Sequence, residues 1–165
     1  MEKCKPVTTP LVTNQKLSKN NGNNQADACT FRSIVGGLLY LTATRPDIMF
    51  LVSLLSRFMH SPSQTHLCAA KRVLRYLKGT LDEGIWYNRH KNIILEGYVD
   101  SDCAGSVDDS KSTTGYIFLF GNGAFSWNSK KQDVVAQSST EAEYIAAATT
   151  VNQALWINKI LVDIA

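Results

Sequence analysis

The sequence predicts an α/β protein in which helices come first and a sheet with one packed helix follows. Apolar residues recur with helical spacing from residue 31 to about residue 78. The short runs 93–99, 114–120 and 124–128 are apolar and aromatic instead, as strands are. The length of 165 residues and a hydrophobic fraction of 44% suit one domain, or one domain and a piece, with a real core.

Residues 1–27 are expected to form an extended or disordered arm. They are polar, contain two prolines and include the run Asn20-Asn-Gly-Asn-Asn. The N-terminus has no apolar signal-peptide core, and residues 48–55 are too few to span a bilayer, so no membrane partner is predicted. The four cysteines are far apart and form no metal-binding pattern, which favours reduced thiols in the cytoplasm or nucleus.

Residues 28–90 are predicted to be helical. The first helix is weakened by Gly36-Gly37, since each glycine costs about 1 kcal/mol relative to alanine. Pro46 suits the first turn of a second helix. Ser63 can cap a third helix with an apolar stripe.

Residues 91–165 are predicted to begin as a sheet. The first strand, 93–99, ends in carboxylates at Asp100 and Asp102. The next two strands flank Gly121-Asn-Gly, and such a short loop is typical of a hairpin because both residue types tolerate positive φ. The three tryptophans of the chain are expected in the core.

A helix start follows the third strand. Ser138 or Thr140 can cap this helix, with Glu141 or Glu143 three residues later, as a capping box requires. One carboxylate therefore leaves the first strand and another lies one turn into the helix. This arrangement can bring two acids together at one end of a sheet.

Paired carboxylates of this kind suit Mg²⁺, which takes oxygen ligands from one or two protein carboxylates together with substrate phosphates. Two such ions about 4 Å apart can activate water and stabilise a leaving oxygen in phosphodiester cleavage. A purely structural interpretation stands beside this one. Asp100 and Asp102 can be turn residues, and Glu141 and Glu143 can be acids favoured by the helix dipole. Spacing alone favours the structural interpretation.

Six ordered motifs change that balance. They are Tyr40-Leu-Thr-Ala-Thr-Arg-Pro-Asp47, Ala70-Lys-Arg-Val-Leu-Arg-Tyr-Leu-Lys-Gly-Thr80, Tyr98-Val-Asp-Ser-Asp102, Asp109-Ser-Lys-Ser-Thr-Thr-Gly-Tyr116, Ser126-Trp-Asn-Ser-Lys-Lys-Gln132 and Ser138-Ser-Thr-Glu-Ala-Glu-Tyr144. Together they resemble the end of the reverse transcriptase and the ribonuclease H region of copia-type retrotransposon Pol polyproteins. The resemblance implies that 28–90 is the connection segment and 91–165 the start of a ribonuclease H-like α/β domain with a mixed sheet.

The resemblance also implies a function and a site. Asp100 matches the first catalytic aspartate, and Glu143 matches the catalytic glutamate on the first helix. The ancestral reaction is Mg²⁺-dependent hydrolysis of the RNA strand in RNA–DNA hybrids, with two metal ions. The rest of a Pol polyprotein is an expected partner.

The chain departs from the family pattern at three places. Cys103 stands where the family usually has tryptophan, and Ser110 stands where it has a basic residue. The third catalytic aspartate of the family lies on the strand after this helix, and no residue of the sequence matches it. The 165 residues are therefore expected to be inactive by themselves.

Basic residues gather in one part of the chain. Seven basic residues oppose two acidic ones between Arg57 and Lys91, whereas four oppose nine from Asn92 onward. The resemblance favours weak nucleic-acid contacts to phosphates by Lys71, Arg72, Arg75 and Lys78. Without it, the solvated face of an amphipathic helix is the simpler interpretation. The three histidines have no ligand spacing, so surface or helix-cap roles are expected.

A second functional hypothesis comes from a different class. The string Arg72-Val73-Leu74-Arg75 matches the RxLR pattern of secreted oomycete effectors, and Asp82-Glu83 follows it. Such proteins act in the cytoplasm or nucleus of host cells, on host proteins, and suppress cell death without catalysis. A four-letter pattern with one free position arises easily in a basic helix, and no signal peptide is visible.

Overall fold

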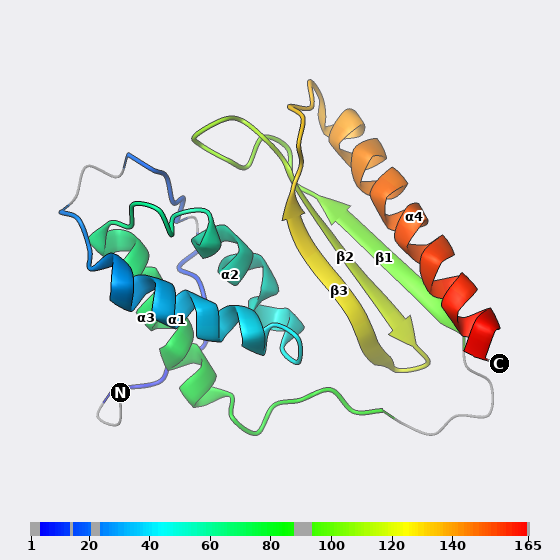
Figure 1. Ribbon diagram of the computed structural model, residues 1–165, viewed down its shortest axis with the longest axis horizontal. Coiled ribbons are helices and arrows are strands. Elements are labelled where there is room, and N and C mark those ends of the chain that lie inside the picture. The colour runs from blue at the N-terminus through cyan, green and yellow to red at the C-terminus, as the bar shows by residue number, and fades with distance from the viewer. Residues whose placement is uncertain (1–3, 14, 21–23, 88–93, 165) are drawn as a thin grey trace. The chain divides into compact units, whose positions relative to one another are not determined.

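The computed structural model describes residues 1–165 except 1–3, 14, 21–23, 88–93 and 165 (Figure 1). The chain divides into two compact units, Met1–Gly84 and Ile85–Ala165. The division falls slightly upstream of the boundary expected at 90/91. Each unit has its own elements and is described separately below.

The first unit is built from helices, as its apolar periodicity predicts. They are α1 (Ala28–Leu41), the short 3-10 helix η1 (Pro46–Ile48), α2 (Met49–Ser56) and α3 (Gln64–Gly79). The core between them contains fully buried side chains from every helix, among them Phe31, Val35, Ile48, Leu55 and Val73. Gly36 and Gly37 lie on the exposed side of α1, where an added Cβ would meet nothing within 4 Å.

Two polar caps begin the longer helices of this unit. Asp27 caps α1 by accepting from the backbone N–H groups of Cys29 and Thr30. The Ser63 hydroxyl caps α3 by accepting from the His66 N–H, and Nδ1 of His66 accepts from the Ser63 N–H, which completes a capping box. His66 is fully buried and stacks on Phe58, with ring centroids 3.9 Å apart. The cap role expected for a histidine is thus confirmed at this position.

A charged network ties η1 to the end of α3. Arg45 and Asp47 form an ion pair of 2.7 Å. The Tyr76 hydroxyl donates to Asp47 at 2.8 Å, and Arg45 donates to the backbone carbonyl and the hydroxyl of Thr80. The hydrogen bond from Arg45 is the main cause that lowers the pKa of Asp47, with a further contribution from Tyr76.

The arm before α1 contacts this helical core. Leu17 and Ala26 are buried, and Leu11 packs against the core. The Ser18 carbonyl lies 3.1 Å from Nε2 of His66. Gln25 forms an isolated antiparallel bridge with Ser63. The described arm residues are therefore part of the packing of the first unit.

The second unit begins with an antiparallel sheet. Its strands are β1 (Leu95–Ser101), β2 (Thr113–Phe120) and β3 (Gly123–Lys131), in the order β1-β2-β3. Gly121 has a positive φ of 63° in the turn between β2 and β3, so the predicted hairpin is confirmed. Ile93 lies outside the described residues. Residues 134–136 belong to no helix or strand.

Helix α4 (Ser139–Ile164) packs along β1 on one face of this sheet (Figure 1). Its buried residues, Ala142, Ala146, Thr150 and Ile157, recur every turn or two and form one stripe. Helices and an open sheet together confirm the α/β class and are consistent with an incomplete ribonuclease H-like fold. The sheet of the described residues is antiparallel throughout.

Two of the three tryptophans contradict the core prediction. Trp86 and Trp156 are 84% and 57% exposed, whereas Trp127 is half-buried. Trp86 precedes β1, and Trp156 lies on the outer face of α4. Over the part of the chain that the structure describes, no helix is both long and apolar enough to cross a bilayer.

Candidate functional site

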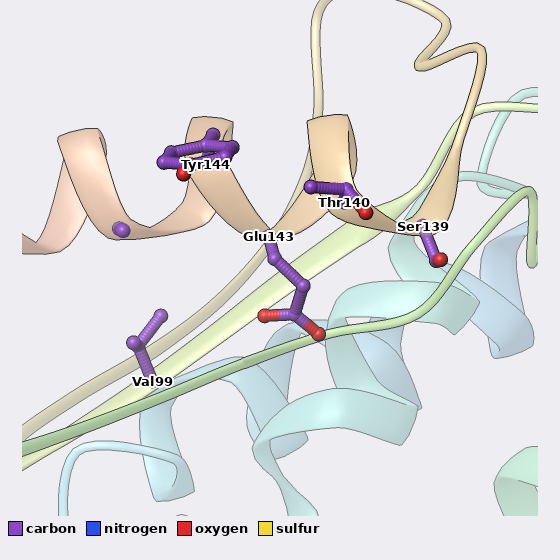
Figure 2. A pocket seen from close by; sticks show the side chains of 6 residues that line it. Val99, Ser139, Thr140, Glu143 and Tyr144 are labelled. Carbon is purple, nitrogen blue, oxygen red and sulfur yellow. The ribbon is translucent and has the colours of Figure 1, made fainter.

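A groove of about 530 Å³ lies between α4 and β1 in the second unit (Figure 2). It is lined by Val99, Ser139, Thr140, Glu143, Tyr144 and Ala147. The Glu143 side chain extends from the first turns of α4 toward the strand that carries Val99. Among the described residues the Glu143 carboxylate makes no hydrogen bond or ion pair, so its oxygens are available to a ligand.

The start of α4 explains why Glu143 has this position. The Ser138 hydroxyl accepts from the Glu141 N–H at 3.1 Å, and the Glu141 carboxylate accepts from the Gln137 N–H at 2.8 Å. Of the alternatives that the sequence left open, Ser138 and Glu141 are therefore the cap pair. Glu143 lies two residues further on and remains exposed beside the groove.

Gln132 connects the start of α4 to the sheet. Its Nε2 lies 3.2 Å from the Ser101 hydroxyl, 3.0 Å from the Thr114 hydroxyl and 3.0 Å from the Ala142 carbonyl. The side chain is buried and connects β1, β2 and α4 at one point. Its Oε1 is buried and has no hydrogen-bond partner among the residues that the structure describes. Gln132 closes the motif Ser126-Trp-Asn-Ser-Lys-Lys-Gln132, but nothing in that motif predicts that its amide joins the helix to the sheet.

Asp100 lies inside β1, opposite Gly115 of β2, and is exposed. The predicted strand stopped one residue earlier. Because side chains alternate along a strand, Asp100 belongs to the face opposite that of Val99, which lines the α4 groove. The structure thus assigns Asp100 and Glu143 to different sides of β1, near its C-terminal end.

A shared metal site at these two residues stays a prediction. Carboxylate oxygens are the ligands that Mg²⁺ prefers, and both side chains are exposed. Within the described part of the chain, however, no three His, Cys, Asp or Glu side chains cluster closely enough to hold a metal ion. The residues present therefore do not make a complete two-metal centre.

Asp102 has a structural role in the loop between β1 and β2. One carboxylate oxygen accepts from the Thr113 N–H, and the Asp102 N–H donates to the Thr113 carbonyl. A side chain at Gly105 would collide with the other carboxylate oxygen. The interpretation of Asp102 as a turn residue is therefore supported, whereas Asp100 is not in a turn.

An ion pair holds the same loop to β3. The Lys131 ammonium lies 2.5 Å from the Asp109 carboxylate. The hydrogen bond from Lys131, with a second from Ser106, lowers the pKa of Asp109 to about 2. Ser110 next to it has a positive φ of 53°. At the position where the family has a basic residue, this chain thus has a strained turn beside an ion pair.

The predicted phosphate-binding residues lie on α3 in the first unit. Arg72 donates from Nε to the Thr9 carbonyl at 3.1 Å and from Nη2 to the Thr9 hydroxyl at 2.9 Å. Arg75 donates to the Lys5 carbonyl at 2.8 Å, and Lys78 donates to the Cys4 carbonyl at 3.0 Å. Lys71 is exposed. Three of the four basic side chains therefore bind the N-terminal arm.

The RxLR string occupies the middle of the same helix. Val73 is fully buried in the core, and Leu74 packs against that core. Arg72 and Arg75 hold the arm through the hydrogen bonds described above. In the folded unit this string is part of a packed helix and not a flexible segment.

Comparisons with known proteins give close relatives over almost the whole chain. The retrovirus-related Pol polyprotein from transposon RE1 of Arabidopsis thaliana is 47% identical over 161 residues, which are 98% of this chain and 11% of that protein. The corresponding polyprotein from transposon TNT 1-94 of Nicotiana tabacum is 43% identical over 172 aligned positions, 99% of this chain and 13% of that protein. This chain thus spans about an eighth of the Pol polyproteins that it matches.

A third relative has a different description. The secreted RxLR effector protein 161 of Plasmopara viticola is 45% identical over 128 residues, which are 77% of this chain and 90% of that protein. No family model matches the chain. No solved structure matches it either.

Proposed function

Because the chain belongs to the family of retrovirus-related Pol polyproteins of copia-type transposons, we propose that it forms their junction between reverse transcriptase and ribonuclease H. The first unit is the helical connection segment in this proposal. The second unit contributes the first strand, the hairpin that follows it and the first helix of the ribonuclease H domain. The proposed activity of the complete domain is hydrolysis of RNA in RNA–DNA hybrids.

One observation carries this proposal. Glu143 presents an unbonded carboxylate in an exposed groove, directly beside the strand that contains Asp100. Glu141 has the same chemistry but is engaged by the helix cap, and Asp102 is engaged by its loop. Of the four acids compared, Asp100, Asp102, Glu141 and Glu143, the two that match the family's catalytic residues are thus the two whose oxygens remain available.

Asp100 and Glu143 would each offer carboxylate oxygens to Mg²⁺, which would supply activation of water and stabilisation of the leaving oxygen. Gln132 would position Glu143 by holding the first turn of α4 against β1 and β2. A third carboxylate is required from beyond the described residues. Among the described residues, no three His, Cys, Asp or Glu side chains are close enough together to hold a metal ion.

The test is an extension of the chain with the strand and aspartate that follow in a Pol relative. We expect no robust cleavage of an RNA–DNA hybrid by the 165 residues, and Mg²⁺-dependent cleavage by the extended chain. Asp100→Asn and Glu143→Gln should each abolish the activity of the extended chain, whereas Asp163→Asn, an exposed acid at the far end of α4, should leave it unchanged. Strong Mg²⁺-dependent cleavage by the 165 residues, lost in Asp100→Asn, would contradict the requirement for a third acid.

A second candidate function is a non-enzymatic effector role in host cells. The observation that favours it is the similarity to the secreted RxLR effector protein 161 of Plasmopara viticola. Expression of the chain in plant cells, with cell-death scoring, tests this candidate directly. Suppression of cell death that survives Asp100→Asn would support it, and death at the level of an empty vector would remove it.

A further inference from the structure

We propose that residues 4–13 of the arm form a strap that occupies the phosphate-binding face of α3 and competes with nucleic acid for it. The inference rests on the proposed function for its ligand, a polyanionic nucleic-acid backbone. It adds a feature that the family relationship does not give, namely that the arm controls the access of nucleic acid to α3. The strap proposal and the proposed function can fail separately. Strap release is measured on the first unit, whereas hybrid cleavage depends on acids of the second unit.

The strap uses the donors that a phosphate would need. Arg72, Arg75 and Lys78 stand at every third position of α3 and donate to three successive points along the arm, at Thr9, Lys5 and Cys4. The arm runs antiparallel to the helix, since the earlier arm residues meet the later helix residues. A nucleic-acid strand on this face would have to replace these hydrogen bonds.

The chemistry of the acceptors makes such replacement favourable. The arm presents neutral carbonyl oxygens and one hydroxyl, whereas a phosphodiester presents charged oxygens. The Arg and Lys donors are charged in both cases, so a phosphate adds Coulomb attraction between opposite charges to hydrogen bonds that are already charge-assisted. The strap compensates by being part of the same chain, which gives it an effective concentration on the order of millimolar. The arm and nucleic acid therefore compete for the basic side chains of α3. The salt concentration and the affinity of the arm shift the balance between them.

Most residues of the strap are exposed, and it is held by the hydrogen bonds to α3 and by the packing of Leu11 against the helical core. Lys5, Pro6, Thr8 and Thr9 are exposed, and only scattered positions such as Val7 and Leu11 are partly buried. One packing contact sits at the helix end: a Cβ added at Gly79 would lie 3.0 Å from Cβ of Pro6. A larger side chain at Gly79 should thus push the strap away without touching any of the basic residues.

The experiment compares the full chain with Gly79→Val and with Gly37→Val. The control is another helical glycine in the first unit, and an added side chain there would enter open space. Nitrogen-15 relaxation of residues 5–13 reports release of the strap, and fluorescence anisotropy of a labelled RNA–DNA hybrid reports binding at several salt concentrations. A synthetic peptide of residues 1–13 is then added to Gly79→Val.

We expect the strap to become mobile in Gly79→Val and to stay ordered in Gly37→Val and in the unchanged chain. Three regained phosphate contacts should make the plot of log affinity against log salt steeper by about 2 to 3, at roughly 0.7–0.9 for each contact. The peptide should return binding toward that of the unchanged chain. An ordered strap in Gly79→Val, or a mobile strap with an unchanged salt slope, would overturn the proposal, and neither result would bear on hybrid cleavage by an extended chain.

Discussion

Replacing Gln132 with alanine should loosen the contact between the helix that carries Glu143 and the strand that carries Asp100. Gln132 is the buried side chain at which β1, β2 and α4 meet. Gln137 provides a matched control because it is the same residue type five positions later and is exposed. The substitution tests whether one amide organises the candidate site.

The magnitude follows from the contacts. The Gln132 amide group has two hydrogens for three acceptors, so at most two full hydrogen bonds are lost, each with a net contribution of about 1 kcal/mol. Removing the buried side chain also leaves a cavity, which adds roughly 1–2 kcal/mol. Loss of the unpartnered Oε1 offsets roughly 1 kcal/mol of this. We therefore expect Gln132→Ala to lower the free energy of unfolding of the second unit by about 2–3 kcal/mol.

The assay is chemical denaturation followed by tryptophan fluorescence. All three tryptophans, at positions 86, 127 and 156, lie in the second unit, so this signal reports that unit selectively. Circular dichroism measured in parallel follows both units together. A difference of less than about 0.5 kcal/mol between Gln132→Ala and Gln137→Ala, the scale of ordinary surface substitutions, would refute the argument.

Three further predictions concern stability and ionisation. Gly36→Ala should stabilise the first unit by about 1 kcal/mol in thermal melts, because a methyl group there meets open space and alanine favours the helix. The pKa of Asp47 is lowered, so its contribution to stability is present at neutral pH and is lost as pH falls through the folded-state pKa. Asp47→Asn should therefore flatten the acid limb of the pH–stability curve, measured by circular dichroism. Carboxyl NMR should find the pKa of Asp109 near 2, and Lys131→Gln should return it toward the usual value for aspartate.

Local signals in the sequence located most of the helices and strands and narrowed the choice of their caps. Apolar periodicity located the helices, and Asn122 between two glycines located the hairpin. The capping motif limited the start of α4 to a few candidates, and only the hydrogen bonds of Ser138 and Glu141 chose among them. Helix periodicity, tight turns and caps depend on residues a few positions apart, so they can be predicted from the sequence directly.

Long-range contacts were not predictable in the same way. The polar composition of the arm indicated little structure, yet its carbonyl groups bind side chains of α3 more than sixty residues away. Because every residue has a backbone carbonyl group, no residue type in the arm predicts these contacts. Trp86 and Trp156 show the reverse case, since aromatic character suggested burial and the structure leaves both side chains largely exposed.

The position of Asp100 depends on strand register. A prediction that ends the strand at residue 99 leaves the carboxylate in a loop, where it could turn toward either face. The pairs Asp100–Gly115 and Ser101–Thr114 extend the ladder and fix Asp100 on the face away from α4. Among the described residues β1 pairs only with β2, so its other edge has no strand partner there. A ligand that contacts both Asp100 and Glu143 would have to reach around that edge. We propose that the strand of the extended chain, with its aspartate, pairs along that edge.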